Sequence, residues 1–514
     1  MNNEKVAVAM KWSAVAEVAS KVISPVTNAI LARILVPEIF GLVATINMVI
    51  SFTNVFTDAG FQKYIIQHEF SDEKDQDDSI NVAFWSNLVL SVLLLAIVVI
   101  FRKPIVSLVS ASDGAAMSSA FTSTSDFSWG IAAAALTLPI TAFSSIQMAV
   151  YKRMMDFKTL FYIRLIGSLI PLIVTIPLAY FTRSFWALVI GSLAGELSNA
   201  VILSVRSPWK PNFSFSFGKF FEMFSFCYWI LLESVLIWLT SYIGTFIVGK
   251  FLSTYYLGIY KTSMTTVNQI TTLFTVSTSA VMFPTISRLQ NNREEMYKFF
   301  LNFMRMVSMI IIPAGIGMYL YSDCITQILL GSQWKEAIPF IGLWGLSSSL
   351  GIVLSSYWDG LFNAIGKPKY SVFTQFLYLV ILVPLLLFGA SKDYETLYRL
   401  RCLSRIIYIA VELIAVRAIL KIGFSSVLKY VAPSVLCSVP MIAAAVILKH
   451  FGGGTVIQII QICACAVVYC VTAMIIPSTR RDIISAVLMM KIPIPSKILK
   501  ALKYSEVKTG ESDD

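Results

Sequence analysis

Apolar runs of about 20 residues recur along the whole 514-residue chain. A helix rises about 1.5 Å per residue, so each run can cross a hydrocarbon core about 30 Å thick. Only 13% of the residues are charged, whereas soluble domains contain about a quarter. The sequence therefore predicts an all-α integral membrane protein without a folded domain outside the membrane.

Turn residues at the ends of the runs divide the chain into about fourteen predicted transmembrane helices. The segment MNNEKVAVAMKW, at the start, does not have the order of a cleavable signal peptide, so the first run is kept as a helix. The predicted spans are 11–32, 39–61, 81–101, 118–150, 159–181, 185–205, 219–249, 255–283, 296–320, 336–364, 370–390, 396–420, 427–448 and 455–477.

The basic residues predict the orientation of these spans. Most of the 40 Lys and Arg residues fall in alternate loops and in the tail after Pro477, and the loops between them are poor in basic residues. Basic loops stay on the cytoplasmic side. Both termini are therefore expected in the cytoplasm. The same distribution accounts for the net charge of +11, so no nucleic-acid partner is implied.

An internal repeat predicts two lobes. The stretch IVGKFLSTYYLG at 247–258 aligns without gaps with ILARILVPEIFG at 30–41, which pairs Arg33 with Lys250 and Gly41 with Gly258. Six spans separate the copies, an even number, so the copies are expected to be parallel and related by an axis along the membrane normal. Pro37 and Gly41 are expected to frame the turn between the first two spans.

The repeat and the spans together give the predicted organisation of the chain. The regions are an N-lobe at 1–206, an inter-lobe loop at 207–218, a C-lobe at 219–421, two further helices at 422–477 and a cytoplasmic tail at 478–514, basic and then acidic.

Several charged residues fall inside predicted spans, where each costs about 2.5 to 3.5 kcal/mol unless it has a partner or a wet cavity. The cations considered for a site are Lys21, Arg164 and Arg305, with Arg33 and Lys250 at the outer ends of their spans. Basic groups outnumber acids, so a cleft that binds an anion is predicted, since Arg grips phosphate bidentately. Arg33 and Lys250 have a simpler alternative, in which they extend to the lipid headgroups.

The acids inside the spans include Glu17, Glu233 and Asp359. Glu17 precedes Lys21 by one turn, so these two can also form a self-neutralised pair. Another group, Arg401, Arg405, Tyr408 and Glu412, has the spacing i, i+4, i+7 and i+11, which predicts one polar stripe on a helix. Some of these charges are expected to be ion pairs between helices.

Several kinds of chemistry are not predicted. GLFNAIGKP, from Gly360, has the wrong spacing for a phosphate-binding loop and a proline in place of Ser or Thr. The two histidines lie in loops, which disfavours a histidine relay in the membrane. SDEKDQDD, from Ser71, resembles the DxD pattern of some sugar transferases, but a solvated acidic loop is expected. No metal site, cofactor or catalytic residue is predicted.

The segment from Lys11 to about Pro211 resembles the polysaccharide transporter branch of the MOP superfamily, the Wzx-type flippases. The matching stretches are FGLVAT at 40–45, SFTNVFTDAGFQKYIIQ at 51–67, VAFWSNL at 82–88, YKRMMDFKTL at 151–160, FWALVIG at 185–191 and PWKP at 208–211. The C-terminal half resembles the family through FLSTYYLGIYK at 251–261, FPTISRLQ at 283–290 and NAIGKPK at 363–369.

The resemblance implies two six-helix lobes around a central cavity, with two extra C-terminal helices. It implies export of an undecaprenyl-diphosphate-linked oligosaccharide from the inner to the outer leaflet of the bacterial cytoplasmic membrane. A proton or sodium gradient would drive export. No family motif marks the coupling residues, and Glu17, Glu233 and Asp359 are candidate coupling carboxylates because of their charge and their depth in the predicted spans. Membrane lipids and other polysaccharide assembly proteins are the further partners expected.

Two alternatives remain. A MATE-type efflux pump of the same superfamily exports organic cations, which an excess of buried positive charge disfavours. A membrane polysaccharide polymerase or ligase needs catalytic residues and usually a large outer loop. The longest predicted outer loop, near 102–117, contains neither His nor Glu.

Overall fold

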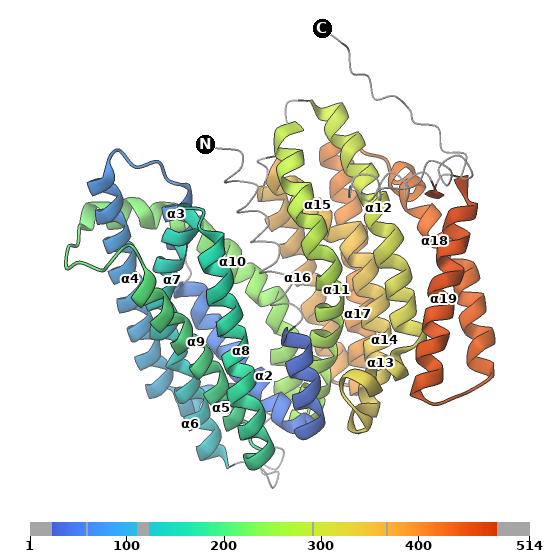
Figure 1. Ribbon diagram of the computed structural model, residues 1–514, viewed down its shortest axis with the longest axis horizontal. Helices are drawn as coiled ribbons and strands as arrows, with labels where there is room; N and C mark the ends of the chain where they lie inside the picture. Colours follow the sequence, from blue (N-terminus) through green and yellow to red (C-terminus); the bar gives the residue numbers. More distant parts are fainter. Residues whose placement is uncertain are drawn as a thin grey trace.

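The computed structural model describes residues 23–57, 60–109, 123–289, 292–365, 368–477 and 479–480. Within these ranges the regular structure is helical and there is no β-strand. The helices form two bundles side by side, followed by an outlying pair (Figure 1). The predicted all-α fold is confirmed.

The helices follow the predicted spans closely. After a helix at 23–34, the long helices are α2 (Pro37–Thr57), α4 (Glu73–Ile100), α6 (Thr124–Ala135), α7 (Thr137–Arg153), α8 (Phe157–Thr182), α9 (Trp186–Arg206), α10 (Phe217–Phe251), α11 (Thr254–Leu289), α12 (Arg293–Leu320), α14 (Ile338–Gly351), α16 (Pro368–Ala390), α17 (Tyr394–Leu420), α18 (Phe424–His450) and α19 (Thr455–Ile475). The short elements are α3 (Phe61–Gln67), α5 (Arg102–Val109), α13 (Ser322–Leu329), a 3-10 helix η1 (Ser332–Ala337), a π-helical turn η2 (Ile352–Ser356) and α15 (Tyr357–Ala364).

Eleven helices in the described ranges are long and apolar enough to cross a membrane. Helices α11 and α17 are not among them, although they have 36 and 27 residues. Both are rich in polar side chains, several of which lie inside the C-lobe. The first predicted span, 11–32, falls mostly outside the described residues, so the total of fourteen remains a prediction.

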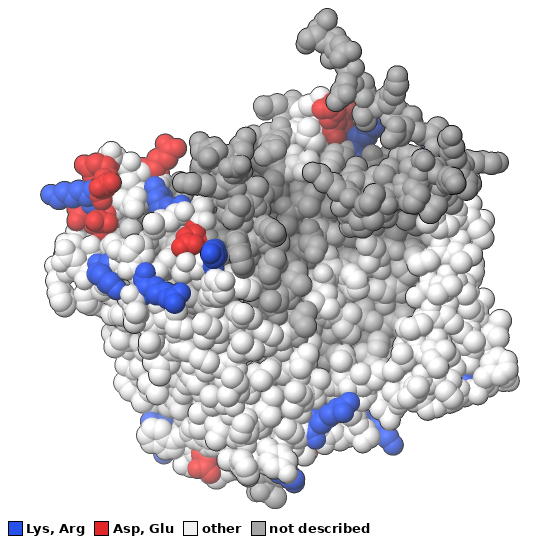
Figure 2. All heavy atoms as spheres, viewed as in Figure 1, with Lys and Arg blue, Asp and Glu red and all other residues white. Residues whose placement is uncertain are grey.

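The molecule has two opposite ends, each named after a segment that it contains. The hairpin end contains residues 35–36, which join the first helix to α2, and the linker end contains residues 207–216. On the face that Figure 2 shows, the Lys, Arg, Asp and Glu side chains of the described residues gather toward these ends. Between the ends, large hydrophobic side chains such as Val89, Ile173 and Val380 are exposed, as on a surface that a helical bundle presents to lipid. The protein is a multi-pass membrane protein.

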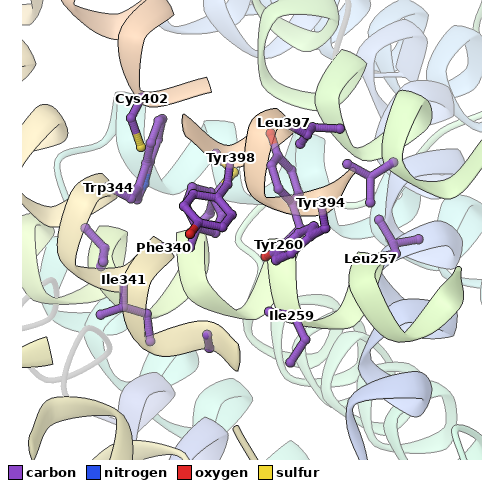
Figure 3. Close-up of a cluster of buried hydrophobic side chains, with 14 of the residues drawn as sticks. Leu257, Ile259, Tyr260, Phe340, Ile341, Trp344, Tyr394, Leu397, Tyr398 and Cys402 are labelled. Atoms are coloured by element: carbon purple, nitrogen blue, oxygen red, sulfur yellow. The ribbon is translucent and has the colours of Figure 1, made fainter. Parts of the chain in front are cut away.

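Each lobe has a large buried apolar cluster toward each end. In the N-lobe, Phe127 and Phe185 belong to the cluster at the hairpin end, and Phe84 and Trp209 belong to the cluster at the linker end. The C-lobe cluster at the hairpin end is rich in aromatic rings contributed by α11, α14 and α17. Figure 3 shows Tyr260, Phe340, Tyr394 and Tyr398 packed together in it.

Helix α10 connects the two lobes physically as well as in sequence. Its Met223 and Cys227 are buried in the N-lobe cluster of the linker end. Its Ile247 and Val248 are buried in the C-lobe cluster of the hairpin end. The last two helices, α18 and α19, pack against α12, where the Tyr469 hydroxyl donates to the Met309 carbonyl over 2.7 Å.

The internal repeat extends beyond the stretch that revealed it. Helix α4 begins at Glu73 and α12 begins at Arg293, and each has 28 residues. The offset between these two starts agrees with the offset of the aligned stretches to within one helical turn. Each helix is followed at once by an eight-residue helix, α5 or α13, with the same offset. The two lobes therefore share matching elements at equivalent places.

Two local expectations were wrong. Gly41 lies inside α2, which begins at Pro37, and does not belong to the turn. The acidic segment after Ser71 is the start of α4, because the Asp72 side chain caps the helix by accepting from the Asp75 amide at 2.6 Å. Lys219 at the start of α10 pairs with Asp75 at 2.8 Å, so the segment, which is largely exposed as predicted, belongs to a helix and contacts another helix instead of forming a loop.

Helices α8 and α9 pack so closely that Gly195 has no room for a side chain. A Cβ atom there would lie 2.6 Å from Cγ of Pro171, and a proline ring cannot rotate away. We expect Gly195→Ala to destabilise the protein by about 1–3 kcal/mol, measured by thermal unfolding in detergent. Gly317→Ala is the matched control, because no atom lies within 4 Å of the added Cβ. Equal stability of the two variants would contradict this packing.

Candidate functional site

The predicted polar stripe of α17 points into the C-lobe. The exposed fractions of Arg401, Tyr408 and Glu412 are 4%, 2% and 0%. These residues share one face because they recur at the spacing of a helix. The stripe therefore places an arginine, a phenol and a carboxylic acid in the protein interior.

Asp359 on α15 joins this stripe. Its carboxylate accepts hydrogen bonds from the Ser371 hydroxyl at 2.8 Å and from the Tyr408 hydroxyl at 3.0 Å. Glu412 lies beside it and interacts with it electrostatically. The two carboxyl groups, of half-buried Asp359 and buried Glu412, thus form an acidic pair with Tyr408 next to both.

Glu412 has few partners. Its two side-chain oxygens are buried and neither has a hydrogen-bond partner among the described residues. The neighbouring Thr374 hydroxyl has one proton, which it can donate to the Ser371 carbonyl at 3.0 Å or to Glu412. A buried carboxyl group with at most one shared donor is a candidate site for a proton or a cation.

Two arginines balance the acids. The Arg401 guanidinium donates to the Tyr378 hydroxyl at 2.9 Å and lies 5.2 Å from the centre of the Trp344 ring. Arg405 attracts the Asp359 carboxylate and lies 6.0 Å from the same Trp344 ring. The cluster thus contains both signs of charge, arranged along α17 from the arginines to Glu412.

A π-helical turn lies beside the cluster. Residues 352–356 adopt it directly before α15, which contains Asp359. Gly351 precedes the turn, and a Cβ atom there would lie 2.7 Å from Nε of Arg405. Turns of this kind are frequent at functional sites, because they interrupt regular helical hydrogen bonding. The sequence contained no sign of this turn.

A second group of side chains lies between the lobes. Lys261 on α11 places its ammonium 4.3 Å from the centre of the Tyr242 ring on α10. Tyr242 stacks on Trp238 with a centroid distance of 5.5 Å. The Trp238 indole then donates to the Ser51 hydroxyl of α2 over 3.0 Å. We call Trp238, Tyr242 and Lys261 the aromatic–lysine row.

This row was missed by the sequence analysis. Lys261 lies near the start of the predicted span 255–283, where a lysine can extend to the membrane surface. The structure leaves Lys261 half-buried. Arg401 is close enough to repel its charge. The tyrosine-rich sequence just before Lys261 is the feature of the sequence that could have indicated this site.

Two of the predicted cations lie on helices of different lobes. Arg164 lies on α8, which packs chiefly on α9 in the N-lobe, and Arg305 lies on α12 in the C-lobe. Three residues after Arg305, Ser308 contacts Ser434 of α18, so this face of α12 points toward α18. A shared anion site formed by Arg164 and Arg305 remains a prediction.

The remaining predicted residues have different settings. Arg33 and Lys250 both lie at the hairpin end, where each donates to a main-chain carbonyl of the opposite lobe, as described below. Glu233 lies in α10, but its side chain is outside the described residues. Lys21 and Glu17 also lie outside them. Their predicted roles remain predictions.

The fold matches transporters of the MOP superfamily. The structure aligns with the lipid II flippase MurJ in an inward closed conformation, with a TM-score of 0.67, 13% identity and coverage of 90% of this chain and 98% of that one. It also aligns with an inward-facing multidrug resistance MATE transporter, with a TM-score of 0.64, 11% identity and coverage of 77% and 94%. The chain therefore has the fold of these transporters.

The family is defined more narrowly by sequence. A family model described as "Polysaccharide biosynthesis protein" matches residues 30–339. An uncharacterized membrane protein in the cps region of Klebsiella pneumoniae is 24% identical over 74% of this chain and 75% of its own length. The succinoglycan biosynthesis transport protein ExoT of Rhizobium meliloti is 21% identical over 88% of both chains. The chain belongs to this family of polysaccharide biosynthesis proteins.

These findings confirm the predicted family and fold. A transport protein and a flippase are among the similar proteins, and neither is a polymerase or ligase. The two parts of the chain singled out above, the acidic pair with its arginines and the aromatic–lysine row, therefore lie in a transporter fold.

The hydrogen bond from Tyr408 to Asp359 should stabilise the C-lobe. We expect Tyr408→Phe to lower the free energy of unfolding by about 1.5–3 kcal/mol, because a buried carboxylate loses a donor. Thermal unfolding in detergent would measure the change. Tyr319→Phe is the control, since Tyr319 is 47% exposed. A Tyr408→Phe variant as stable as the control would show that the bond contributes nothing.

Proposed function

We propose that the protein flips an undecaprenyl-diphosphate-linked oligosaccharide from the inner to the outer leaflet of a bacterial cytoplasmic membrane. Its membership of the polysaccharide biosynthesis family supports a saccharide substrate. The observation that carries the proposal is the aromatic–lysine row at the boundary between the lobes. The linker end faces the cytoplasm, in agreement with its basic loops.

The row offers the two kinds of contact that such a substrate needs. Sugar rings stack their apolar C–H faces on Trp and Tyr rings, and Trp238 and Tyr242 are both half-buried. A diphosphate cannot enter hydrocarbon bare, because burying an unpaired charge costs several kcal/mol. The Lys261 ammonium can replace part of its hydration, with Lys21, Arg164 and Arg305 as the other cations proposed along the path. The polyprenyl tail stays in lipid.

An ion gradient drives the movement in this proposal. The buried pair formed by Asp359 and Glu412 can hold a proton or a sodium ion, since carboxylate and hydroxyl oxygens serve both. The Tyr408 hydroxyl is hydrogen-bonded to Asp359 and lies near Glu412, so the strength of its hydrogen bond depends on the charge of both acids. Glu17 and Glu233 remain further candidates for coupling. The membrane lipids and other polysaccharide assembly proteins are the remaining proposed partners.

Removal of the proposed cations should stop transport. We expect Lys261→Ala, Lys21→Ala and Arg305→Ala each to lower the flipping rate at least about tenfold, since loss of one buried charge contact of about 1.4 kcal/mol or more changes a rate by that factor. The measurement is flipping of a fluorescent polyprenyl-diphosphate sugar in proteoliposomes. Lys261→Arg should retain most of the rate.

Lys392→Ala is the matched control, because Lys392 is exposed in the loop before α17. Equal rates in Lys261→Ala and Lys392→Ala would contradict the role of the row. Uptake of an organic cation by the wild-type protein, without movement of the lipid-linked sugar, would instead support the efflux-pump alternative. Accumulation of the lipid-linked saccharide on the inner leaflet after gene deletion would identify the natural substrate.

Replacing the two acids by neutral amides should remove the effect of the ion gradient without stopping substrate movement itself. We expect Asp359→Asn and Glu412→Gln to abolish stimulation of flipping by an imposed proton or sodium gradient, because an amide cannot bind and release the ion. Exchange of substrate down its own gradient should continue. Glu395→Gln is the control, as Glu395 is exposed at the start of α17. Full stimulation in both variants would place the coupling ion elsewhere.

A further inference from the structure

The lobes meet at the hairpin end through a contact that has the symmetry of the repeat. A Cβ atom on Gly41 of α2 would overlap the carbonyl oxygen of Thr254 on α11. A Cβ atom on Gly258 of α11 would overlap the carbonyl oxygen of Pro37 on α2. The alignment that pairs Gly41 with Gly258 also pairs Pro37 with Thr254.

Each half of this contact is therefore a copy of the other. Such a contact, in which residue i meets j and j meets i, is isologous, and the axis that relates the two lobes passes between the glycines. The main chains touch here without side chains between them, as in small-xxx-small contacts of membrane helices. We call this contact between α2 and α11 the glycine seam.

Two cations cross the seam in opposite directions. Arg33, before α2, donates to the carbonyl of Ile328 in α13 at 2.7 Å. Lys250, near the end of α10, donates to the carbonyl of Ser107 in α5 at 3.2 Å. Helices α5 and α13 are the matching eight-residue helices of the two lobes. Arg33 and Lys250 are themselves paired by the repeat.

The acceptors explain why cations are used. Ile328 and Ser107 lie in the last turns of their helices, where carbonyls have no partner within the helix. The helix dipole also places partial negative charge there, which favours Lys and Arg. When the lobes separate, water can replace each cation, so neither helix end is left buried and unpaired.

Two further hydrogen bonds between the lobes lie beside the seam. The Trp334 indole of η1 donates to the Ala32 carbonyl at 2.8 Å, and the Gln333 amide donates to the Leu35 carbonyl at 2.9 Å. Ala32 is 0% exposed and belongs to the same buried cluster as Trp334. The hairpin end is thus closed by packing and by hydrogen bonds to main-chain carbonyls. Each of these hydrogen bonds between the lobes can be broken without separating a buried ion pair.

We propose that the glycine seam is the gate of the transporter at the hairpin end. Gly41 and Gly258 allow it to close, and Arg33 and Lys250 hold it closed. It opens when the lobes rock apart to release substrate on that side of the membrane. The substrate assigned to the gate rests on the proposed function, but the existence of the gate can be tested without any substrate.

Thiol labelling tests the gate directly. Ala32→Cys is introduced into protein in which the exposed native thiols are removed as Cys463→Ser and Cys470→Ser. A membrane-impermeant maleimide should label this cysteine slowly while the seam is closed. Labelling should rise severalfold with Arg33→Ala plus Lys250→Ala, and further with Gly41→Leu plus Gly258→Leu, because the larger side chains hold the helices apart.

Two controls separate opening of the seam from general loosening. Lys103→Ala plus Lys335→Ala removes two exposed cations of the hairpin end and should leave labelling unchanged. Gly317→Leu adds the same bulk where no atom lies within 4 Å and should also leave it unchanged. Labelling that does not rise in the seam variants, or rises equally in the controls, would overturn the proposal.

Cross-linking tests whether the seam must open during transport. Arg33→Cys and Ile328→Cys, joined by a short reducible bifunctional thiol reagent, should stop flipping of the fluorescent polyprenyl-diphosphate sugar, and reduction should restore it. Asp323→Cys with Gln458→Cys is the matched control, because these side chains are bonded at 2.7 Å between α13 and α19 without crossing the seam.

If transport continues while Arg33→Cys and Ile328→Cys are cross-linked, the seam is a fixed hinge. That result would overturn the proposal that the seam is a gate. Labelling that responds as expected while no lipid-linked sugar moves would support the gate and contradict the proposed substrate. The two proposals therefore fail through different measurements.

Discussion

The lack of water in the hydrocarbon core is the constraint on which the rest of this structure depends. Every helix must satisfy its own backbone, and every charged side chain needs a partner inside the protein. The charges of α17 meet this requirement by pointing into the C-lobe, where Arg401 contacts Tyr378 and Asp359 contacts Tyr408. Glu412 is the exception, since among the described residues its buried oxygens have at most the Thr374 hydroxyl, which Ser371 also accepts. Burying a carboxyl group with so few hydrogen-bond donors lowers stability. We therefore propose that Glu412 takes part in ion coupling and does not only stabilise the fold.

The same constraint explains what the sequence could predict. Long apolar runs locate the helices, because hydrocarbon admits few other structures, and the spacing of Arg401, Arg405, Tyr408 and Glu412 located a polar face that the structure places inside the C-lobe. Pairing between distant helices could not be predicted. Nothing in the sequence brings Asp359 next to Tyr408, because their contact depends on how α15 and α17 cross and on the π-helical turn at 352–356. Lys261 was overlooked since depth in the membrane was judged from one helix at a time.

The repeat shows how far a short sequence match can be trusted. The alignment of Gly41 with Gly258 predicted equivalent positions, and the structure shows that these positions touch each other. The expected role was wrong, however, because Gly41 was assigned to a turn and lies inside α2. A glycine a few residues after a proline is typical of a turn, but in a membrane helix a glycine equally permits close approach of another backbone. Only the partner helix distinguishes the two.

The seam and the aromatic–lysine row are mechanically connected. Helix α2 contains both Gly41, at the seam, and Ser51, which accepts the hydrogen bond of Trp238. Helix α11 contains both Gly258 and, three residues later, Lys261. The end of α10 packs with the C-lobe through Ile247 and Val248, while its start packs with the N-lobe. In the proposed opening of the seam, separation of α2 from α11 would move Ser51, at one end of the row, away from Lys261, at the other. A ligand bound along the row would lose contacts in the same movement, which links its release to the proposed gate.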